Sequence, residues 1–144
     1  MSTTTRGEGE TMLLAAAMAA DLRPGNVVAL CGDLGAGKTC FVRGLCKALG
    51  GDASLVNSPT FTIMQEYPVA CGRLVHVDAY RLRGEDELQT IGWDELLQDG
   101  NAVIAVEWPE RIIGAIPDTA TRVVLEHGGH DIRHIEIHAG GDSA

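Results

Sequence analysis

Residues 32–39 read Gly32-Asp33-Leu34-Gly35-Ala36-Gly37-Lys38-Thr39, a full match to the P-loop pattern G-x-x-x-x-G-K-[ST]. An apolar run precedes the pattern at Val27–Cys31 and predicts a buried strand. Residues 40–49 follow with helical spacing, and Gly50-Gly51 ends the predicted helix. Because strand, glycine loop and helix occur in this order, we expect the loop to bind the phosphates of a nucleotide. A plain glycine turn does not explain the Lys38-Thr39 pair.

Each part of this loop has an expected role. Glycines let the backbone approach the phosphates closely, so that its N–H groups surround them as an anion nest. The start of the helix adds unpaired N–H groups and the positive end of its dipole. We expect Lys38 to reach the β- and γ-phosphates, Thr39 to bind Mg²⁺, and the Asp33 carboxylate to point away from the phosphates. The expected nucleotide-binding residues here are Asp33, Leu34, Gly35, Ala36, Gly37, Lys38, Thr39 and Cys40.

Two later strands are predicted to end in a carboxylate. Residues 73–78 end at Asp78, and the apolar run Ala102–Glu107 ends at Glu107. Ligands of α/β sheets collect outside the carboxyl ends of the strands. We therefore expect Asp78 to hold Mg²⁺ directly or through water, although an Asp at this point can also simply cap the next turn. Glu107 is expected to position the attacking water or to complete the Mg²⁺ shell.

Two further residues are candidates for contact with the nucleotide. Trp108 follows Glu107 directly, and either packs over the nucleotide or anchors the end of its strand in the core. Thr60 follows Pro59, whose ring stiffens the loop, and is a candidate switch residue that senses the γ-phosphate. With Lys38, Asp78 and Glu107 as the catalytic set, these residues complete the predicted site.

The rest of the pattern predicts an α/β domain. We expect a three-layer P-loop NTPase fold, with a mostly parallel central sheet, an antiparallel hairpin near the C-terminus and helices on both faces. An amphipathic helix over residues 12–20 is expected to bury Leu13, Ala16, Ala17 and Ala20. Further expected elements are strands at 61–69, 122–126 and 132–138, helical segments at 85–97, broken at Gly92, and at 109–115, and a hairpin turn at Gly128-Gly129.

Length and composition narrow the class of protein. A chain of 144 residues predicts one domain over residues 1–144, with loose ends at 1–7 and 140–144. The net charge of −9, from 20 acidic residues against 11 Lys and Arg, argues against a protein that grips nucleic acid on its own. No apolar run approaches the ~20 residues that span a bilayer. The acids concentrated between Asp78 and Asp99 form either a solvated helix face or a docking surface for a basic partner.

The cysteines and histidines add two expectations. Four cysteines without a C-x-x-C pair predict reduced thiols in a cytoplasmic protein. Cys40 differs from the others, because the start of a helix lowers the pKa of a thiol. The histidines of the tail either bind a metal or lie on a solvated strand face; they are His127, His130, His134 and His138.

Four motifs follow one another along the chain: residues 32–39, Ser58-Pro59-Thr60-Phe61, His76-Val77-Asp78-Ala79-Tyr80-Arg81-Leu82 and Val106-Glu107-Trp108-Pro109-Glu110. Together they resemble the TsaE family, the small bacterial P-loop ATPases of tRNA threonylcarbamoyladenosine (t6A) biosynthesis. The resemblance runs from the first helix to about Arg111, and the hairpin tail carries no matching motif.

The resemblance implies an ATPase that is weak alone and works with the subunits TsaB and TsaD. That assembly transfers a threonylcarbamoyl group to adenosine 37 of tRNA, and the ATPase supports repeated turnover without performing the transfer. By motif, Lys38 and Thr39 hold phosphate and Mg²⁺, and Asp78 serves the metal. Glu107 and Trp108 complete the site, while Thr60 belongs to the switch. Cys40 departs from the Thr or Ser that many members have.

Two alternatives remain open at this point. A small-metabolite kinase would use the same P-loop but needs a lid that carries arginine, and Arg81 and Arg111 are the candidates near site motifs. A nucleotide-gated binding module without meaningful turnover would differ from an ATPase in rate and not in sequence.

Overall fold

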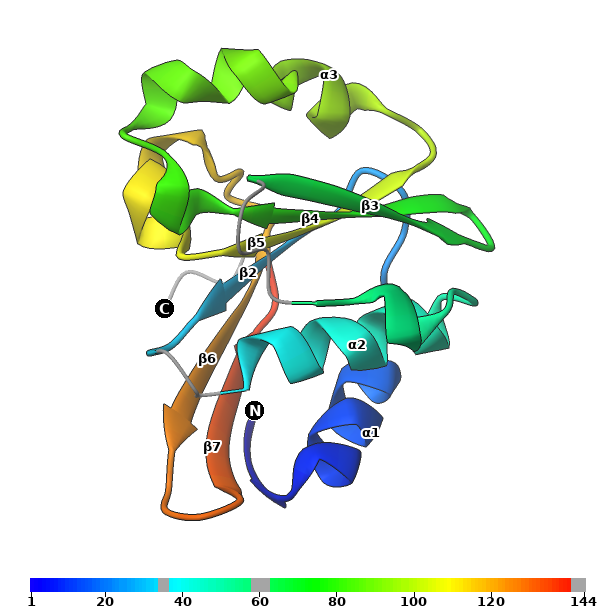
Figure 1. Ribbon diagram of the computed structural model, residues 1–144, viewed down its shortest axis with the longest axis vertical. Helices are drawn as coiled ribbons and strands as arrows, with labels where there is room; N and C mark the ends of the chain where they lie inside the picture. Colours follow the sequence, from blue (N-terminus) through cyan, green and yellow to red (C-terminus); the bar gives the residue numbers. More distant parts are fainter. Residues whose placement is uncertain (34–36, 58–62, 141–144) are drawn as a thin grey trace.

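The computed structural model describes residues 1–33, 37–57 and 63–140, which form one seven-stranded sheet with helices packed against it (Figure 1). The strands are β1 (Ser2–Arg6), β2 (Val27–Cys31), β3 (Met64–Val69), β4 (Gly72–Asp78), β5 (Ala102–Glu107), β6 (Thr121–His127) and β7 (Ile132–His138). The α-helices are α1 (Glu8–Ala19), α2 (Lys38–Ala48) and α3 (Trp93–Gln98). Short 3₁₀ segments are η1 (Ala53–Leu55), η2 (Ala79–Arg81), η3 (Glu85–Ile91) and η4 (Pro109–Ala115).

The sheet has a parallel centre and antiparallel flanks. Its strand order is β1-β7-β6-β2-β5-β4-β3, and the four neighbours β6, β2, β5 and β4 run parallel. β7 pairs antiparallel with β6 and β1, and β3 pairs antiparallel with β4. The predicted C-terminal hairpin is therefore confirmed. The predicted parallel centre is confirmed for β6, β2, β5 and β4, but three of the six strand pairings are antiparallel. One of these, β3–β4, is joined by a tight turn at Ala70-Cys71, and tight turns connect only antiparallel neighbours.

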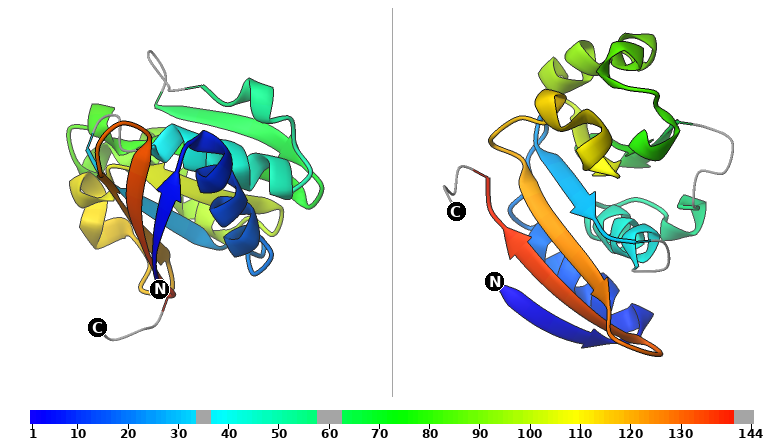
Figure 2. Two further views of the ribbon diagram at one scale, coloured as in Figure 1. Left: turned by 90° about the horizontal axis from the view of Figure 1, so that it is seen from below. Right: turned by 90° about the vertical axis from the view of Figure 1, so that its left-hand side faces the viewer.

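Helices cover both faces of the sheet, as predicted (Figures 1 and 2). On one face α1 and α2 pack with Val28, Leu30 and Val103 of the central strands. On the other face η3, α3 and η4 pack with the alternate residues of the same strands, such as Val75 and Ile104. Since the central strands are buried on both faces, they are continuously apolar rather than alternating.

The N-terminal segment differs from the prediction. Residues 2–6, expected to be loose, form β1 at the edge of the sheet, so that expectation is wrong. Sequence alone did not reveal the strand, because Ser2–Arg6 is polar and gains its order by pairing with β7.

The buried face of α1 also differs from the prediction. The helix buries Thr11, Ala15 and Ala19, whereas Leu13 is 71% exposed. Residues 12–20 are nearly all apolar, so their pattern does not determine which face turns inward. The close approach of α2 determines it, because a Cβ on Gly44 would lie 2.6 Å from the Met12 carbonyl oxygen and 2.8 Å from the Ala15 Cβ.

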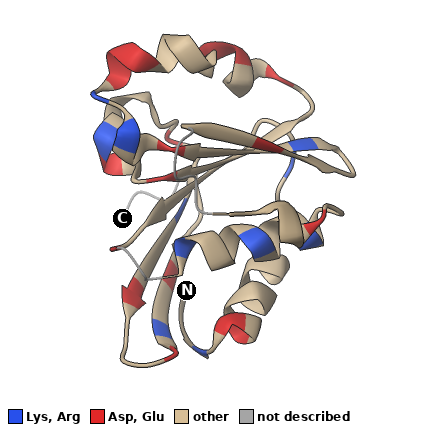
Figure 3. Ribbon diagram, in the orientation of Figure 1, with Lys and Arg blue, Asp and Glu red and all other residues tan. Residues whose placement is uncertain are grey.

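Charge is unevenly distributed over the two helical layers. Acidic residues cover much of the layer formed by η3 and α3 (Figure 3), and Glu85, Asp86, Asp94 and Glu95 there are exposed. Within residues 1–33, 37–57 and 63–140, no helix is long and apolar enough to cross a membrane.

Candidate active site

The ends of β2, β4 and β5 bring the predicted site residues together. Glu107 pairs in register with Leu30 of β2 on one side and with Asp78 of β4 on the other. The loop that follows β2 therefore begins beside Glu107, with Asp78 on the next strand. The prediction that Asp78 and Glu107 both lie at the carboxyl ends of strands near this loop is confirmed, whereas phosphate binding by the loop stays a prediction.

Two glycines frame the loop between β2 and α2. Gly32 has φ 155° and Gly37 has φ 102°, and Gly37 is the N-cap of α2 in the left-handed region. A side chain at Gly37 would meet only ordinary contacts, so its backbone conformation is what requires glycine there. Leu34, Gly35 and Ala36, which we predicted to bind nucleotide, lie outside the described residues, as does Thr60.

Lys38 carries the buried positive charge of the site. Its side chain is only 5% exposed, and Nζ donates a 2.6 Å hydrogen bond to the Gly32 carbonyl oxygen. Nζ also lies 3.6 Å from the centroid of the Trp108 ring. Burial lowers the pKa of Lys38, while the nearby Glu107 acts in the opposite direction. A carbonyl and an aromatic ring hold an ammonium without neutralising it, so its charge remains available to an anion.

The Trp108 ring contacts both Lys38 and the ring of Tyr80. Its backbone has φ 58°, in the left-handed region that tryptophan rarely adopts. Its ring centroid lies 5.2 Å from that of Tyr80, and the Arg111 guanidinium lies 4.9 Å from the Tyr80 ring. Trp108 also packs against the core cluster on the α3 side of the sheet. The ring thus anchors the end of β5, one of its two predicted roles, and also covers the lysine; its contact with a nucleotide stays a prediction.

Asp78 uses its two oxygens differently. Oδ1 accepts a 3.1 Å hydrogen bond from the Tyr80 N–H and so caps η2, while Oδ2 lies 4.0 Å from Nε of Arg81. Burial raises the pKa of Asp78, and the Tyr80 N–H partly offsets this effect. The capping role is therefore real, and it leaves a desolvated carboxylate beside Glu107.

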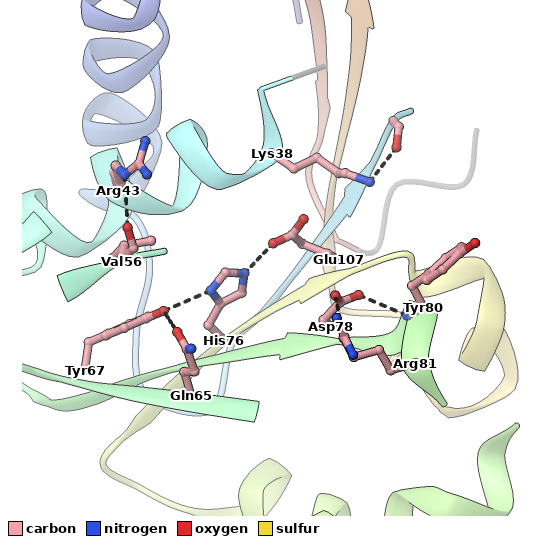
Figure 4. Close-up of polar contacts among 11 residues, drawn as sticks. Lys38, Arg43, Val56, Gln65, Tyr67, His76, Asp78, Tyr80, Arg81 and Glu107 are labelled. Carbon is pink, nitrogen blue, oxygen red and sulfur yellow. Dashed lines mark hydrogen bonds and ion pairs between the residues drawn. The ribbon is translucent and has the colours of Figure 1, made fainter. Parts of the chain in front are cut away.

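Glu107 is 6% exposed and its carboxylate lies between Lys38 and β4 (Figure 4). Its Oε2 lies 2.5 Å from Nε2 of His76, which is fully buried. The other ring nitrogen of His76 lies 3.2 Å from the Tyr67 hydroxyl. We assigned His76 and Tyr67 no role from the sequence. The available signal was a lone polar residue inside the apolar run Leu74-Val75-His76-Val77.

The remaining predicted residues lie around the start of α2. Thr39 is half-buried in its first turn, and Asp33 is exposed. Cys40 is buried and its Sγ donates to the Glu8 carbonyl oxygen at 3.5 Å. Burial raises the pKa of this thiol, so the expectation of a lowered pKa is wrong: desolvation outweighs the helix terminus.

The histidines of the tail make separate contacts. Nδ1 of His134 lies 3.1 Å from Oγ1 of Thr4, and His138 lies 3.5 Å from Glu136. In the part of the chain that the structure describes, no three His, Cys, Asp or Glu side chains are grouped to hold a metal ion. A metal site in the hairpin therefore has no support there.

Comparison with known proteins identifies the family. The family model described as threonylcarbamoyl adenosine biosynthesis protein TsaE matches residues 5–135. The chain belongs to the TsaE family. It is 42% identical to the TsaE protein of Bacillus subtilis over 133 residues, covering 92% of this chain and 82% of the relative. The TsaE protein of Aquifex aeolicus is 43% identical over 105 residues, covering 72% of this chain and 73% of the relative.

A solved structure supports the same conclusion. The crystal structure of YdiB from Bacillus subtilis superposes with a TM-score of 0.74 at 34% identity, and covers 98% of this chain and 86% of that one. The family match includes β6 and the first four residues of β7, so it extends beyond the motifs that carried the resemblance in the sequence.

Proposed function

We propose that this TsaE-family chain is a single-domain P-loop ATPase that binds and hydrolyses ATP within the machinery that forms t6A at position 37 of tRNA. In this role it supports turnover of the TsaB–TsaD transferase in the cytoplasm and does not perform the transfer. One observation carries the proposal: the buried ammonium of Lys38, at the first residue of α2, lies at the sheet edge where Asp78 and Glu107 end their strands.

The contacts of Lys38 support the proposed phosphate binding. Its Nζ donates to the Gly32 carbonyl and lies over Trp108, both of which are weaker partners than a phosphate oxygen. A nucleotide phosphate would therefore draw Nζ into a charge-assisted hydrogen bond. The first N–H groups of an α-helix have no carbonyl partner within the helix, so those of α2 would add donors and the positive end of the helix dipole. Trp108, already beside Nζ, would shield this contact from water.

The residues present also fit a Mg²⁺ ion. Hard divalent cations prefer oxygen ligands, and Thr39, Asp78 and Glu107 offer a hydroxyl and two carboxylates near one strand end. Burial destabilises the ionised form of Asp78, and a cation would compensate for that cost. We propose these three residues as the metal set. When bound, Mg²⁺ would neutralise charge that develops on the phosphates.

Glu107 is the proposed general base. Its carboxylate lies between Lys38 and His76, is nearly excluded from solvent, and so can orient a water molecule for attack. Exposed acids dominate the net charge of −9, so tRNA contact through this chain alone is expected to be indirect or weak. We do not advance the kinase alternative, because its two candidate lid arginines already have partners in the described structure: Arg81 faces Asp78 and Arg111 faces the Tyr80 ring.

The test is ATP turnover by the purified chain, alone and with TsaB and TsaD. We expect a low basal rate that depends on Mg²⁺ and rises when both subunits are added. A rate that is indifferent to the subunits would contradict the proposed role. Turnover that instead required a small phosphoryl acceptor would restore the kinase interpretation.

A further inference from the structure

His76 is a buried polar residue without a role in the site described so far. Among the described residues, the buried polar or charged side chains are Thr5, Thr11, Lys38, His76 and Glu107. The hydroxyls of Thr5 and Thr11 bond to each other at 2.7 Å, and Lys38 and Glu107 belong to the site. His76 is 0% exposed in the middle of β4. An imidazole at such a position costs stability unless both ring nitrogens have partners.

Both ring nitrogens of His76 have partners, and these form a chain across the sheet (Figure 4). Nε2 lies 2.5 Å from Oε2 of Glu107, and Nδ1 lies 3.2 Å from the Tyr67 hydroxyl. The Tyr67 hydroxyl in turn donates to Oε1 of Gln65 at 2.5 Å. The chain of contacts therefore runs from the end of β5, through β4, to β3.

The sheet register explains why these groups meet. His76 pairs with Ala105, so Glu107 lies two residues further along the neighbouring strand and on the same face. Tyr67 pairs with Leu74, two residues before His76, and also points to that face. Each side chain is thus held by a strand rather than by a loop, which gives the chain a defined geometry.

The contacts also determine which carboxylate oxygen of Glu107 faces the nucleotide site. An ionised carboxylate can only accept hydrogen bonds, so the nitrogen that faces it, Nε2, carries the proton. Oε2 of Glu107 is held by this bond, which fixes the carboxylate and leaves both lone pairs of Oε1 to act toward the nucleotide. Burial raises the pKa of Tyr67 to about 12, so its hydroxyl keeps its single proton at neutral pH. When that proton goes to Oε1 of Gln65, the hydroxyl oxygen can only accept from the ring; when it goes to Nδ1 of His76, the bond to Gln65 is given up.

We propose that His76 is a positioning residue that locks the Glu107 carboxylate, so that Glu107 acts on the water or the metal through Oε1 alone. Tyr67 fixes the orientation of the imidazole and is the next member of the same chain. The catalytic part of this inference rests on the proposed function. The hydrogen bond between His76 and Glu107 does not depend on that function, so it can be tested separately from the catalytic role.

Two amide substitutions make a matched pair. The amide nitrogen of Gln reaches about the position of Nε2, whereas that of Asn reaches about the position of Nδ1. His76→Asn should therefore lose the Glu107 contact and lower kcat about 10- to 100-fold, as loss of a supporting partner typically does. Its Kd for ATP should change less than about twofold, because Lys38 and the helix terminus are untouched. His76→Gln should keep most of the wild-type kcat, because its amide nitrogen can still donate to Glu107.

Three outcomes would overturn the proposal. One is an unchanged kcat in His76→Asn. Another is equal loss of kcat in both variants, which would mark His76 as a packing residue. The third is a parallel loss of ATP affinity and of the melting temperature in both variants.

A spectroscopic measurement on the wild-type chain tests the bond without any activity. In the chain labelled with ¹⁵N-histidine, which contains five histidines, one Nε2 proton should exchange slowly with solvent, because His76 is fully buried. That resonance should shift in Glu107→Gln and disappear in His76→Asn. The proposal would be overturned if no Nε2 proton exchanged slowly. It would also be overturned if the resonance of that proton were the same in the wild-type chain and in Glu107→Gln. If the resonance behaves as expected but the chain hydrolyses no ATP, the proposed function fails and the hydrogen-bond chain stands.

Discussion

Two groups of carboxylates in this chain differ in their surroundings. Those over η3 and α3, such as Asp86 and Glu95, are exposed. Asp78 and Glu107, at the strand ends, are desolvated and are held by the Tyr80 N–H and by His76. Abundance of charge therefore does not mark the site. Burial together with a specific partner does, because burial makes the charged state of Asp78 costly while the partner holds the carboxylate in one position.

The largest expected effect is that of Lys38→Ala. Removing the buried cation should abolish measurable hydrolysis and weaken ATP binding by about 100-fold or more, since Nζ is the proposed contact to the phosphates. Titration with ATP and steady-state turnover measure both effects. Lys47→Ala is the matched control, because Lys47 is an exposed lysine of the same helix. Unchanged hydrolysis in Lys38→Ala would remove the basis of the proposed site.

Glu107→Gln should have the next largest effect. The amide still offers an oxygen to His76 but cannot act as a base, so kcat should fall about 100-fold or more while the Kd for ATP stays within about twofold. Glu95→Gln, the same change in the exposed group, should leave kcat unaltered. A large fall in melting temperature for Glu107→Gln would instead mark Glu107 as structural.

Asp78→Asn should slow hydrolysis by about 10- to 100-fold, and should harm Mg²⁺-dependent turnover more than nucleotide binding. Asn keeps an oxygen for the Tyr80 N–H, so the cap of η2 is retained. Equal loss of binding and turnover would indicate a structural Asp. Titration of turnover against Mg²⁺ separates the two.

The same variant makes a prediction about stability and pH. The pKa of Asp78 is raised by folding, so between its usual value of 3.8 and the raised value the folded state binds more protons than the unfolded state. Stability from this group therefore falls as pH rises through that window, and ionised Asp78 costs stability at neutral pH. Asp78→Asn should raise the melting temperature at pH 7 by about 1–3 °C, and the gain should vanish below pH 3.8.

The smallest effect is expected from the exposed group itself. Asp86→Asn combined with Glu95→Gln should change the free energy of unfolding by about 0.5 kcal/mol or less and leave the basal rate unchanged. Thermal unfolding and turnover of the isolated chain provide the measurement. A lower basal rate of ATP hydrolysis would show that the exposed acids also contribute to the site, and would contradict the distinction between them and the two desolvated acids. Reduced stimulation by TsaB and TsaD alone would identify the η3–α3 layer as the docking surface considered from the sequence.

Much of the fold and the site follows from local pattern. The order of strand, glycine loop and helix at residues 27–48, the acids at the ends of β4 and β5, and the C-terminal hairpin were predictable, because each depends on neighbours in the sequence. Periodicity, turn residues and the carboxyl-end rule act over a few residues, and the sequence contains them directly.

Other features of the fold and of the site depend on tertiary structure alone. β1 is a strand only because β7 offers its edge, and the buried face of α1 is the one that meets Gly44 of α2. Burial of Cys40 outweighs the helix terminus that its position suggested. His76 is isolated in the sequence and gains its meaning from Glu107, 31 residues away, on the adjacent strand. These features depend on which distant groups exclude water and complete hydrogen bonds, and no local pattern carries that information.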